Sequence, residues 1–378
     1  MHILQVINSL NIGGAEQLVV GLLPKLWGLG CEVDLCVFNG VETALTRQVE
    51  EIQKTTCKGM KFIRLTNEGP EYSLKYIPKL RKVLRNYDIA HAHNTSAQMT
   101  LAAASIGLRD LQIVTTEHST NNRRRHIPLM KPLDRWMYSK YDKVIAISQP
   151  AADDIIKYIP NISKKTVVIS NGVDLDKFSK AQPYKDGELK DISGKIVEIG
   201  QKKIIIQVAG LKYPKDQKTL IDSLKYLPDD FNVWIVGDGA LHDEIHEYAA
   251  KAAEKLKGGS CRIVFFGNRK DVPRLLRTAD IVCMSTLYEG LSLSNLEGMA
   301  AGKPFVASDV EGIREVTDGY GILCPAKDAK AFADAFIHLS TDKAFYKGVV
   351  ARCYQRACQY SIDSTAAGYA QVYEELVN

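Results

Sequence analysis

The sequence lacks the features that would place it among membrane, secreted or zinc-binding proteins. No apolar run approaches the roughly 18 residues that span a bilayer, and the opening MHILQVINSL has neither a basic region nor a cleavage site. We therefore expect a cytoplasmic protein that begins at Met1. The eight cysteines form no C-x-x-C pair, and most lie in apolar, strand-like stretches. This pattern favours buried free thiols over a zinc or redox motif.

A strong excess of charge of one sign is also missing, since the formal net charge is only +5. Residues 1–180 contain 24 Lys and Arg against 17 Asp and Glu, or +7, and the remaining residues contain 25 against 27, or −2. A basic first half could face a membrane surface or an anionic lipid carrier, but solvated charge explains it equally well. No strand interleaves aromatic and basic residues, so we expect no nucleic-acid partner.

Short runs rich in Ile and Val do recur, and longer helical patterns separate them. The 378 residues are enough for two domains, and the 46% hydrophobic and 25% charged fractions are typical of a folded globular protein. Strands that are apolar throughout and alternate with helices predict parallel sheets covered on both faces. The sequence therefore predicts an α/β protein with two doubly wound, Rossmann-like domains. The predicted strands are 2–8, 32–38, 61–65, 88–93, 112–117, 143–148 and 166–170, then 203–210, 231–237, 261–267, 280–285 and 304–308.

The domain boundary is predicted from a polar segment, AQPYKDGELKDISGK, which shows no sustained periodicity. We place an interdomain linker there, at about residues 178–200. The predicted domains are 1–180 and 195–360, and the last segment, STAAGYAQVYEELV, is helical by composition and spacing.

Ligands of an open parallel sheet bind outside the carboxyl ends of the strands, so the loops there are the candidate sites. In the first loop, Gly13 and Gly14 precede a helix, where backbone N–H groups can approach a phosphate or sugar. The spacing is neither G-x-G-x-x-G nor that of a P-loop, which excludes a nicotinamide or ATP fingerprint.

The loop STLYEGLSLSNLEGMAAGKP is the most informative, because two carboxylates flank the start of a helix. Glu289 follows a strand and can face a bound sugar, while Glu297 lies eight residues later inside a helix that begins near Ser292. The first N–H groups of that helix can then bind a phosphate, and Glu297 can reach ribose hydroxyls. The alternative is a capping box formed by Ser294 and Glu297.

The E-x7-E spacing followed by GMAAGKPFVAS resembles the signature of glycosyltransferase family 4, which has the GT-B fold. The resemblance extends along nearly the whole chain and implies two domains facing across a cleft, with a C-terminal helix, 361–378, packing back on the first domain. Its further motifs, in order, are NIGGAEQ, TTEHST, VVISNGVDLDKF, VAGLKYPKDQKTLIDSL, IVGDGALHDEI, FFGNRKDVPRLLRTADI and SDVEGIREV.

The resemblance also implies roles for individual residues. Lys215 would hold the donor diphosphate and Glu289 would meet the transferred sugar, while His118 would lie beneath the sugar. The family usually has Arg where this chain has Gly210, and Lys212 is the candidate substitute. The implied catalytic residues are Glu289, His118 and Lys215, and the implied donor-binding residues are Gly13, Gly14, Lys212, Asn268, Arg269, Leu291, Ser292, Leu293 and Glu297.

The family is retaining, and a Lys with a helix N-terminus can stabilise the departing diphosphate without a metal or other cofactor. We therefore expect a retaining, metal-independent transfer of a hexose-type sugar from a UDP or GDP sugar. The acceptor would be a glycan, a lipid-linked molecule or a small molecule, in cell-surface polysaccharide synthesis, and the enzyme could lie at the inner face of the membrane. The alternatives are a same-fold nucleotide-sugar 2-epimerase and a non-catalytic nucleotide-sugar binder, which the missing Arg keeps open.

Three other groups of residues have competing interpretations. His91 and His93 alternate on one strand and could bind a metal, but packing or, for His93, an acceptor contact is favoured. Asp174 and Asp176 form a D-x-D, yet they follow NGV in the interdomain segment, so we expect no metal there. The basic cluster of Arg123, Arg124 and Arg125 is either solvated surface or a contact for an anionic acceptor.

Overall fold

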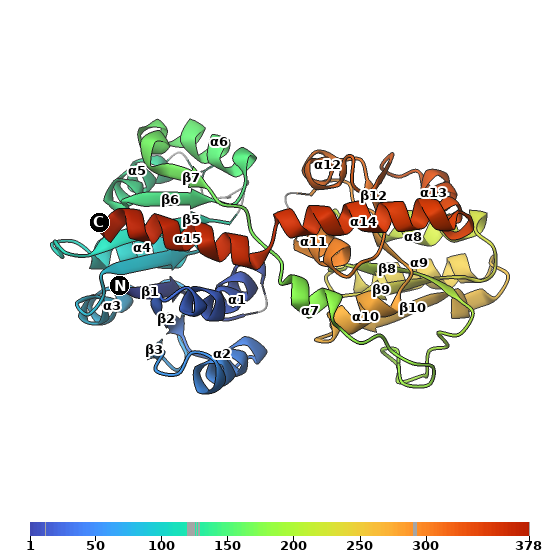
Figure 1. Cartoon of the computed structure of the whole chain (residues 1–378), viewed down its shortest axis with the longest axis horizontal. Coiled ribbons are helices and arrows are strands. Elements are labelled where there is room, and N and C mark those ends of the chain that lie inside the picture. Colours follow the sequence, from blue (N-terminus) through green and yellow to red (C-terminus); the bar gives the residue numbers. More distant parts are fainter. Residues whose placement is uncertain (12, 119–124, 126, 128, 290–292, 378) are drawn as a thin grey trace. The chain divides into compact units, whose positions relative to one another are not determined.

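The computed structural model describes residues 1–11, 13–118, 125, 127, 129–289 and 293–377, which form two units (Figure 1). The first unit comprises Met1–Gly172 and Ile362–Asn378, and the second comprises Val173–Ser361. Each unit contains a fully parallel sheet with helices on both of its faces, so the predicted α/β class with two doubly wound sheets is confirmed.

Within the described residues, the first unit has a seven-stranded sheet in the order β3-β2-β1-β4-β5-β6-β7. Its strands are β1 (His2–Ile7), β2 (Glu32–Asn39), β3 (Phe62–Thr66), β4 (Ile89–His93), β5 (Gln112–Glu117), β6 (Lys143–Ala146) and β7 (Thr166–Val168). Its helices are α1 (Gly14–Gly28), α2 (Ala44–Thr55), α3 (Tyr76–Leu84), α4 (Thr95–Ala104), α5 (Met130–Lys140), α6 (Gln149–Tyr158), the 3-10 helix η2 (Pro160–Lys165) and α15 (Ile362–Val377).

Side chains of the inner strand β1 point alternately into two hydrophobic cores of the first unit. Ile3 and Ile7 pack into one core with α1 and α15, whereas Leu4 and Val6 pack into the other with α3 and α4. Because successive residues of a strand point to opposite faces, one apolar run fills both cores. This explains why the strand has no polar alternation in the sequence.

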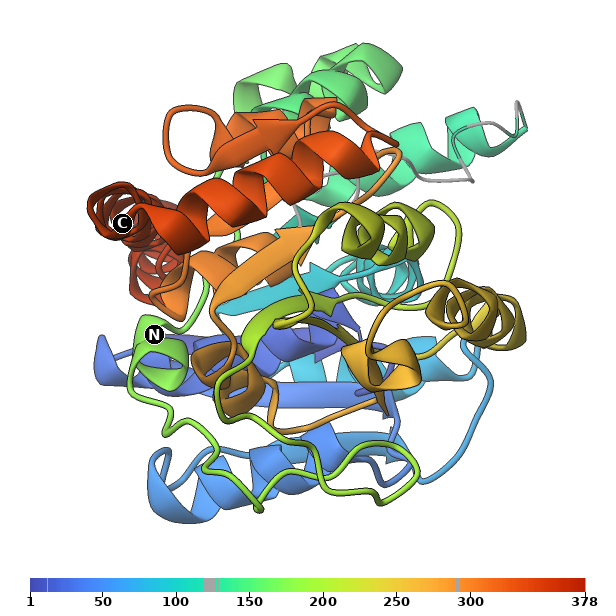
Figure 2. The ribbon, with the colours of Figure 1, turned by 90° about the vertical axis from the view of Figure 1, so that its right-hand side faces the viewer.

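The described residues of the second unit form a six-stranded sheet in the order β10-β9-β8-β11-β12-β13. Figure 2 shows this sheet in yellow-green to orange, with helices covering it. Its strands are β8 (Lys203–Val208), β9 (Phe231–Val236), β10 (Ile263–Gly267), β11 (Ile281–Met284), β12 (Phe305–Ser308) and β13 (Ile322–Cys324). Its helices are α7 (Leu175–Ser179), α8 (Gln217–Ser223), α9 (His242–Ala253), α10 (Val272–Thr278), α11 (Leu293–Ala300), α12 (Glu311–Thr317), α13 (Ala329–Thr341) and α14 (Lys343–Gln359), with short 3-10 turns η3 (Leu224–Tyr226) and η4 (Gly259–Arg262).

The polar segment predicted as a linker belongs to the second unit. Leu189 and Val197 are buried in the core of that unit, and a bridge between Lys190 and Ile196 closes a small hairpin. The chain instead passes from one unit to the other at Gly172 and returns at Ile362. The predicted position at 178–200 was therefore wrong, because its three buried apolar side chains, Phe178, Leu189 and Val197, were too few to reveal the packing.

Two features expected from the sequence can be compared directly with the described residues. Six of the eight cysteines are buried free thiols, and Cys261 and Cys358 are exposed. Among the described helices, none combines the length and the apolar character needed to cross a bilayer.

Candidate active site

The candidate donor site lies where the strand order of the second sheet reverses. β8 has β9 on one side and β11 on the other, so the chain leaves the carboxyl ends of β8 and β11 in loops that lead to helices on opposite sides. Such a switch point leaves a crevice between the loops where ligands of open α/β sheets bind. The loop after β8 contains Lys212 and Lys215, and the loop after β11 contains Glu289.

Hydrogen bonds join these two loops directly. Lys215 and Thr286 form an antiparallel bridge, the Leu287 N–H donates to the Pro214 carbonyl at 3.0 Å, and the Asp216 N–H donates to the Ser285 carbonyl at 3.1 Å. The Ser285 hydroxyl also donates to the Asp216 carbonyl at 2.7 Å. The backbone therefore fixes the position of Lys215 relative to the β11 loop before any ligand binds.

The Lys215 ammonium forms an ion pair with the Glu289 carboxylate, and both side chains are largely buried. Burial and the neighbouring Lys212 lower the pKa of Lys215 to about 8. Lys215 is therefore predominantly a cation at neutral pH. An ammonium in this position can stabilise a diphosphate, and the carboxylate can accept hydrogen bonds from sugar hydroxyls.

Gly210 leaves space that the Lys212 side chain partly occupies. A Cβ atom at Gly210 would lie 3.7 Å from Lys212 Cε, so the Lys212 side chain passes close to the position where an arginine would begin. Lys212 is exposed, and its charge acts on Lys215. The arrangement agrees with Lys212 as the substitute cation.

A glycine loop after β9 packs against the same region. Gly237 has a φ of +130°, and a Cβ atom there would lie 2.2 Å from the Ala209 carbonyl oxygen. A Cβ atom at Gly239 would lie 2.4 Å from the Leu211 carbonyl oxygen. The two glycines thus allow the β9 loop to approach the backbone of the β8 loop more closely than any other residue would.

Asn268 and Arg269, two of the implied donor-binding residues, differ in how accessible they are. Asn268 is exposed directly after β10, whereas Arg269 is engaged by Asp271 through two hydrogen bonds of 2.7 and 2.6 Å. Asp271 also accepts a hydrogen bond from the Tyr184 hydroxyl. Arg269 therefore orders the β10 loop, and Asn268 is the more accessible group.

Helix α11 contains the second carboxylate of the E-x7-E motif. Leu293 is its first residue, and Leu291 and Ser292 lie outside the described residues. Burial raises the pKa of Glu297, and Lys177 acts in the opposite direction. Ser294 lies inside the helix, one residue after its start, so it does not occupy the N-cap position that the capping-box alternative requires.

The first unit contains a buried network of histidines at the ends of β4 and β5. His93 Nδ1 lies 3.1 Å from His118 Nε2, and His93 Nε2 lies 2.7 Å from Gln5 Oε1. The Gln5 amide donates to the Tyr373 hydroxyl at 2.9 Å, and this hydroxyl lies 2.6 Å from His91 Nδ1. The network thus connects His118 to α15, more than 250 positions later in the sequence.

The histidine rings are neutral. Burial lowers the pKa of His118 to about 4, and burial together with the neighbouring histidines holds the pKa values of His91 and His93 well below their usual range. With the Gln5 amide oriented as it is, His93 Nε2 carries the proton and Nδ1 accepts from His118 Nε2. His118 Nδ1 is then an acceptor, with no partner among the described residues.

The metal alternative for His91 and His93 does not fit this network. His91 Nε2 lies 2.8 Å from Thr116 Oγ1, so both nitrogens of both rings are hydrogen-bonded to protein groups. The D-x-D aspartates are also structural, because Asp174 accepts from the Lys177 N–H at the start of α7 and Asp176 pairs with Lys180. The part of the chain that the structure describes contains no cluster of three metal-binding side chains.

Two predicted loop sites of the first unit are occupied by the protein itself. Arg125 is only 7% exposed and pairs with Glu117 at 2.7 Å and with Asp154, so an acceptor contact by Arg125 would have to displace both carboxylates. Arg123 and Arg124 lie outside the described residues. A Cβ atom at Gly13 would lie 2.2 Å from Glu16 Oε2, which shows that the Glu16 carboxylate covers Gly13, next to the start of α1 at Gly14.

The structure adds an aromatic pair that the sequence analysis did not single out. The rings of Tyr213 and Tyr288 meet edge to face with centroids 6.0 Å apart, and both side chains are exposed. They flank the Lys215–Glu289 pair because the two loops are joined. In the sequence, each tyrosine stands next to a predicted site residue, Tyr213 after Lys212 and Tyr288 before Glu289. This position could have drawn attention to both tyrosines, but their contact depends on the bridge between Lys215 and Thr286.

Two family models match the chain. One, described as Glycosyltransferase Family 4, matches residues 12–177, and the other, described as Glycosyl transferases group 1, matches residues 202–342. The first match extends five residues into the second unit, which begins at Val173, and the second match covers the strands and loops of the candidate donor site.

Curated relatives and a solved structure point in the same direction. The lipopolysaccharide core biosynthesis mannosyltransferase LpsB of Rhizobium meliloti is 30% identical over 291 residues, which cover 72% of this chain and 76% of LpsB. An Escherichia coli UDP-Gal:alpha-D-GlcNAc-diphosphoundecaprenol alpha-1,3-galactosyltransferase is 27% identical over 308 residues, or 76% and 74% of the two chains. A crystal structure of Anabaena Alr3699/HepE in complex with UDP and glucose is similar in fold, with a TM-score of 0.77 and 21% identity over 98% of this chain and 99% of that one.

Proposed function

The chain belongs to glycosyltransferase family 4 and is a glycosyltransferase, and from this premise we propose how it acts. The donor is a hexose-type sugar linked to a nucleoside diphosphate, UDP or GDP, and it binds in the crevice of the second unit between the β8 and β11 loops. The transfer retains the anomeric configuration and needs no metal ion or other cofactor.

The observation that carries the proposal is the Lys215–Glu289 pair at the switch point of the second sheet. A cation and a carboxylate side by side suit the two ends of a diphosphate sugar, because the ammonium attracts the diphosphate and the carboxylate binds sugar hydroxyls. The bridge that joins the two loops supports this assignment, since it holds both groups before the donor arrives.

In the proposed reaction, the bond between the anomeric carbon and the diphosphate oxygen breaks, and both bonding electrons leave with the diphosphate. Lys215, Lys212 and the first N–H groups of α11 stabilise the charge that develops there. The acceptor hydroxyl attacks from the same face, and its proton passes to an oxygen of the departing phosphate. Glu289 orients the sugar and Glu297 binds the ribose, so the cations supply the charge stabilisation that a metal would otherwise provide.

The acceptor is proposed from the relatives. LpsB acts in lipopolysaccharide core biosynthesis, and the E. coli relative is named for a diphosphoundecaprenol-linked acceptor. We propose a glycan or lipid-linked acceptor for this chain, in the synthesis of a cell-surface polysaccharide at the cytoplasmic side of the membrane. His118 is the sugar-side candidate of the first unit, because its Nδ1 has no partner among the described residues. His93 is fully buried with both ring nitrogens engaged, so the predicted acceptor contact of His93 is replaced by a role in positioning His118.

The test begins with the donor. Thermal-shift measurements with UDP, GDP, ADP and their sugars identify the base, because a ligand that binds only the folded state raises Tm. The selected donor is then incubated with and without lipid-linked acceptors, with and without EDTA, and the product is analysed by NMR. The expected product is a glycoside with the donor's anomeric configuration, formed equally in EDTA.

Other outcomes would contradict the proposal in distinct ways. A C2 epimer of the sugar, formed from donor alone, would indicate a nucleotide-sugar epimerase. Donor binding without turnover under any acceptor would indicate a non-catalytic binder. An inverted product, or activity lost in EDTA and restored by a divalent ion, would exclude the proposed mechanism while leaving the family assignment intact.

A further inference from the structure

Helix α5 presents an exposed apolar stripe that no described part of the chain covers. Leu129, Leu133 and Trp136 follow the i, i+4, i+7 spacing of one helical face, and they are 85%, 41% and 36% exposed. Ile127, just before the helix, is 50% exposed. We call these four residues the α5 apolar stripe. Several large apolar side chains gathered on one exposed helix face indicate an interaction surface, whereas single exposed ones do not.

The helix itself is firmly held, so the stripe is presented on a rigid element. Its opposite face buries Asp134, Met137 and Tyr138. Asp134 accepts a hydrogen bond of 3.0 Å from the hydroxyl of Tyr158 on α6, and the Tyr138 hydroxyl donates to the buried Glu117. The exposed stripe is therefore not the consequence of a loosely packed helix.

Cations border the stripe. Lys131 and Arg135 lie on one side of α5 and Lys140 lies at its end, and none of the three pairs with a carboxylate among the described residues. Asp134 is the one acidic residue of the helix, and it is buried. The exposed face of α5 is thus apolar and basic, without exposed acid.

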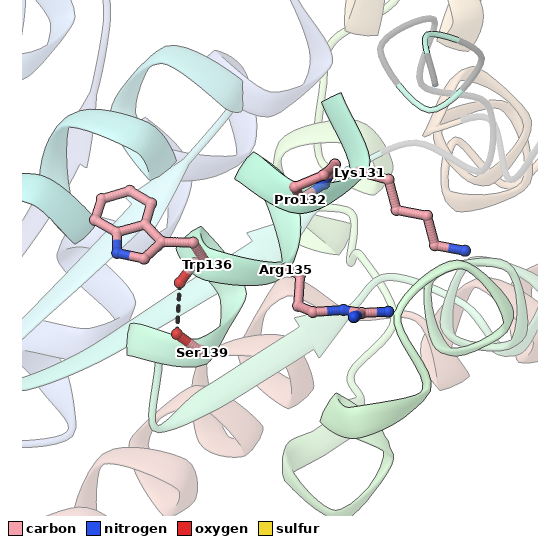
Figure 3. Close-up of a pocket in the computed structure, with 5 residues that line it drawn as sticks. All are labelled: Lys131, Pro132, Arg135, Trp136 and Ser139. Atoms are coloured by element: carbon pink, nitrogen blue, oxygen red, sulfur yellow. Dashed lines mark hydrogen bonds between the residues drawn. The ribbon is translucent and has the colours of Figure 1, made fainter. Parts of the chain in front are cut away.

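Figure 3 shows how these side chains are arranged around a shallow depression of about 500 Å³. Lys131 and Arg135 point to one side, Trp136 points to the other, and Pro132 lies between them on the helix. The Ser139 hydroxyl donates to the Trp136 carbonyl at 2.6 Å, which keeps this polar group within the helix. Apolar and cationic groups therefore occupy separate strips of one surface.

We propose that this face of α5 docks the enzyme on the surface of a membrane that contains anionic phospholipids. Trp, Leu and Ile side chains enter the boundary between headgroups and acyl chains, and Lys131, Arg135 and Lys140 contact the lipid phosphates. The complementarity of charge selects an anionic lipid surface over a soluble glycan, which would offer neither acyl chains nor a plane of phosphates. The inference concerns where the enzyme acts and does not depend on the chemistry of transfer.

The test is flotation of the full-length protein with vesicles of phosphatidylcholine alone or mixed with phosphatidylglycerol. We expect binding to the mixed vesicles and a blue shift of tryptophan emission that Trp136→Phe removes. Trp234 is fully buried, and the third tryptophan, Trp27, is half-buried against the core on the other face of the sheet. The double variant Leu133→Ala, Trp136→Ala should lower the partition coefficient about tenfold. Its matched control is Leu74→Ala, which removes a side chain that is 83% exposed elsewhere in the first unit.

A second pair of variants tests the charges. Lys131→Ala with Arg135→Ala should lower binding to phosphatidylglycerol vesicles about tenfold and remove the preference over phosphatidylcholine. Lys343→Ala with Lys347→Ala removes two cations at the same spacing on α14 and should change nothing. All variants should keep the wild-type Tm and the thermal shift with the donor, so a failure of docking is distinguishable from a failure of the proposed function.

Two results would overturn the inference. The first is wild-type protein that stays in the aqueous phase with both kinds of vesicle, or α5 variants that bind as the wild type does. The second is a concentration-dependent dimer in light scattering that Leu133→Ala, Trp136→Ala abolishes in the absence of vesicle binding, which would make the stripe a contact between copies of the chain.

Discussion

Lys215 and Glu289 neutralise each other when no ligand is present. In the proposed reaction, a diphosphate at Lys215 would compete with the carboxylate for the ammonium, and Glu289 would then be released to interact with the sugar. The exchange costs little because the backbone of both loops is already fixed by the bridge between Lys215 and Thr286. Single side chains in this crevice should therefore have large and separable effects on the reaction.

Replacement of Lys215 by Met keeps the apolar stem and removes the charge. We expect kcat/KM for the donor to fall about 10²-fold to 10³-fold, since the variant loses a cation that stabilises the departing diphosphate. Steady-state kinetics with the identified donor measures the change. The control is Lys218→Met, which removes a partly exposed lysine of α8 that pairs with Glu244 on α9, and it should retain wild-type rates. Equal rates in both variants would remove Lys215 from the site.

Replacement of Glu289 by Gln tests the sugar-binding carboxylate. We expect kcat to fall about 10²-fold, because a sugar held less accurately reacts more slowly, while the Kd for the free nucleoside diphosphate changes little. Calorimetric titration and single-turnover kinetics separate the two quantities. A variant that loses affinity for the nucleotide and keeps its kcat would assign Glu289 to binding alone.

The histidine network predicts a dependence of stability on pH. His91, His93 and His118 have folded-state pKa values below their usual value of about 6.5, that of His118 being about 4. Between about pH 6.5 and pH 4, the unfolded chain therefore binds more protons than the folded chain does. As the pH falls through this interval, the free energy of unfolding decreases by up to about 1.4 kcal/mol per pH unit for each histidine.

Urea unfolding of the wild type and of His91→Gln at pH 7.5 and 5.5 measures this effect. The variant has one fewer buried titrating ring, so its loss of stability over this interval should be smaller, although its stability at the higher pH is lower. A loss of the same size in both proteins would show that the network does not set the acid sensitivity.

At the scale of elements, the site depends on how four loops of the second unit pack against one another. The bridge joins the β8 and β11 loops, and the Gly237 N–H donates to the Gly267 carbonyl at 2.8 Å, while the Leu211 N–H donates to the Asp238 carbonyl at 3.1 Å. These hydrogen bonds connect the loops that follow β8, β9 and β10, at the carboxyl ends of these strands. A change in one loop should therefore affect the position of charges on another.

Gly237→Ala should destabilise this packing. A Cβ atom would lie 2.2 Å from the Ala209 carbonyl oxygen, and the φ of +130° disfavours any side chain. We expect a loss of about 2–3 kcal/mol in the free energy of unfolding. Gly319→Ala is the matched control, because its φ is also positive but no atom lies within 4 Å of the added Cβ. It should lose only about 1 kcal/mol in denaturant titrations.

At the scale of the whole molecule, the donor residues of the second unit and the histidine network of the first unit belong to separately packed cores. The final helix, α15, packs on α1, and Tyr373 ties it to His91 and Gln5. A ligand of the second unit can therefore change the local stability of its own loops without changing the core of the first.

Hydrogen exchange read by mass spectrometry tests this separation in the intact chain. A nucleoside diphosphate should slow exchange in the loops at 209–216 and 285–289 and leave the strands β1 and β4 unchanged, because the bound ligand stabilises the backbone bonds around it. Lys215→Met should lose this protection at the same nucleotide concentration. Protection confined to the first unit would place the donor elsewhere.

The sequence by itself determined the class of the protein, because burial follows local periodicity. Apolar runs such as KIIIQVAG and FNVWIVG predicted strands covered on both faces, and the E-x7-E spacing singled out the β11 loop, where we propose that the donor binds. The short strand β13 and the small hairpin between 189 and 197 were missed, since they bury too few side chains to leave a pattern.

Only the tertiary structure decided which distant residues meet. Lys215 and Glu289 are 74 positions apart, and His91 and Tyr373 are 282 apart, so their contacts depend on strand order and loop packing that no local pattern contains. The same holds for Arg125, which a sequence presents as one of three surface cations and the fold pairs with Glu117. Periodicity specifies which face of an element is buried, whereas the partner of a polar side chain is fixed only when the chain has closed around it.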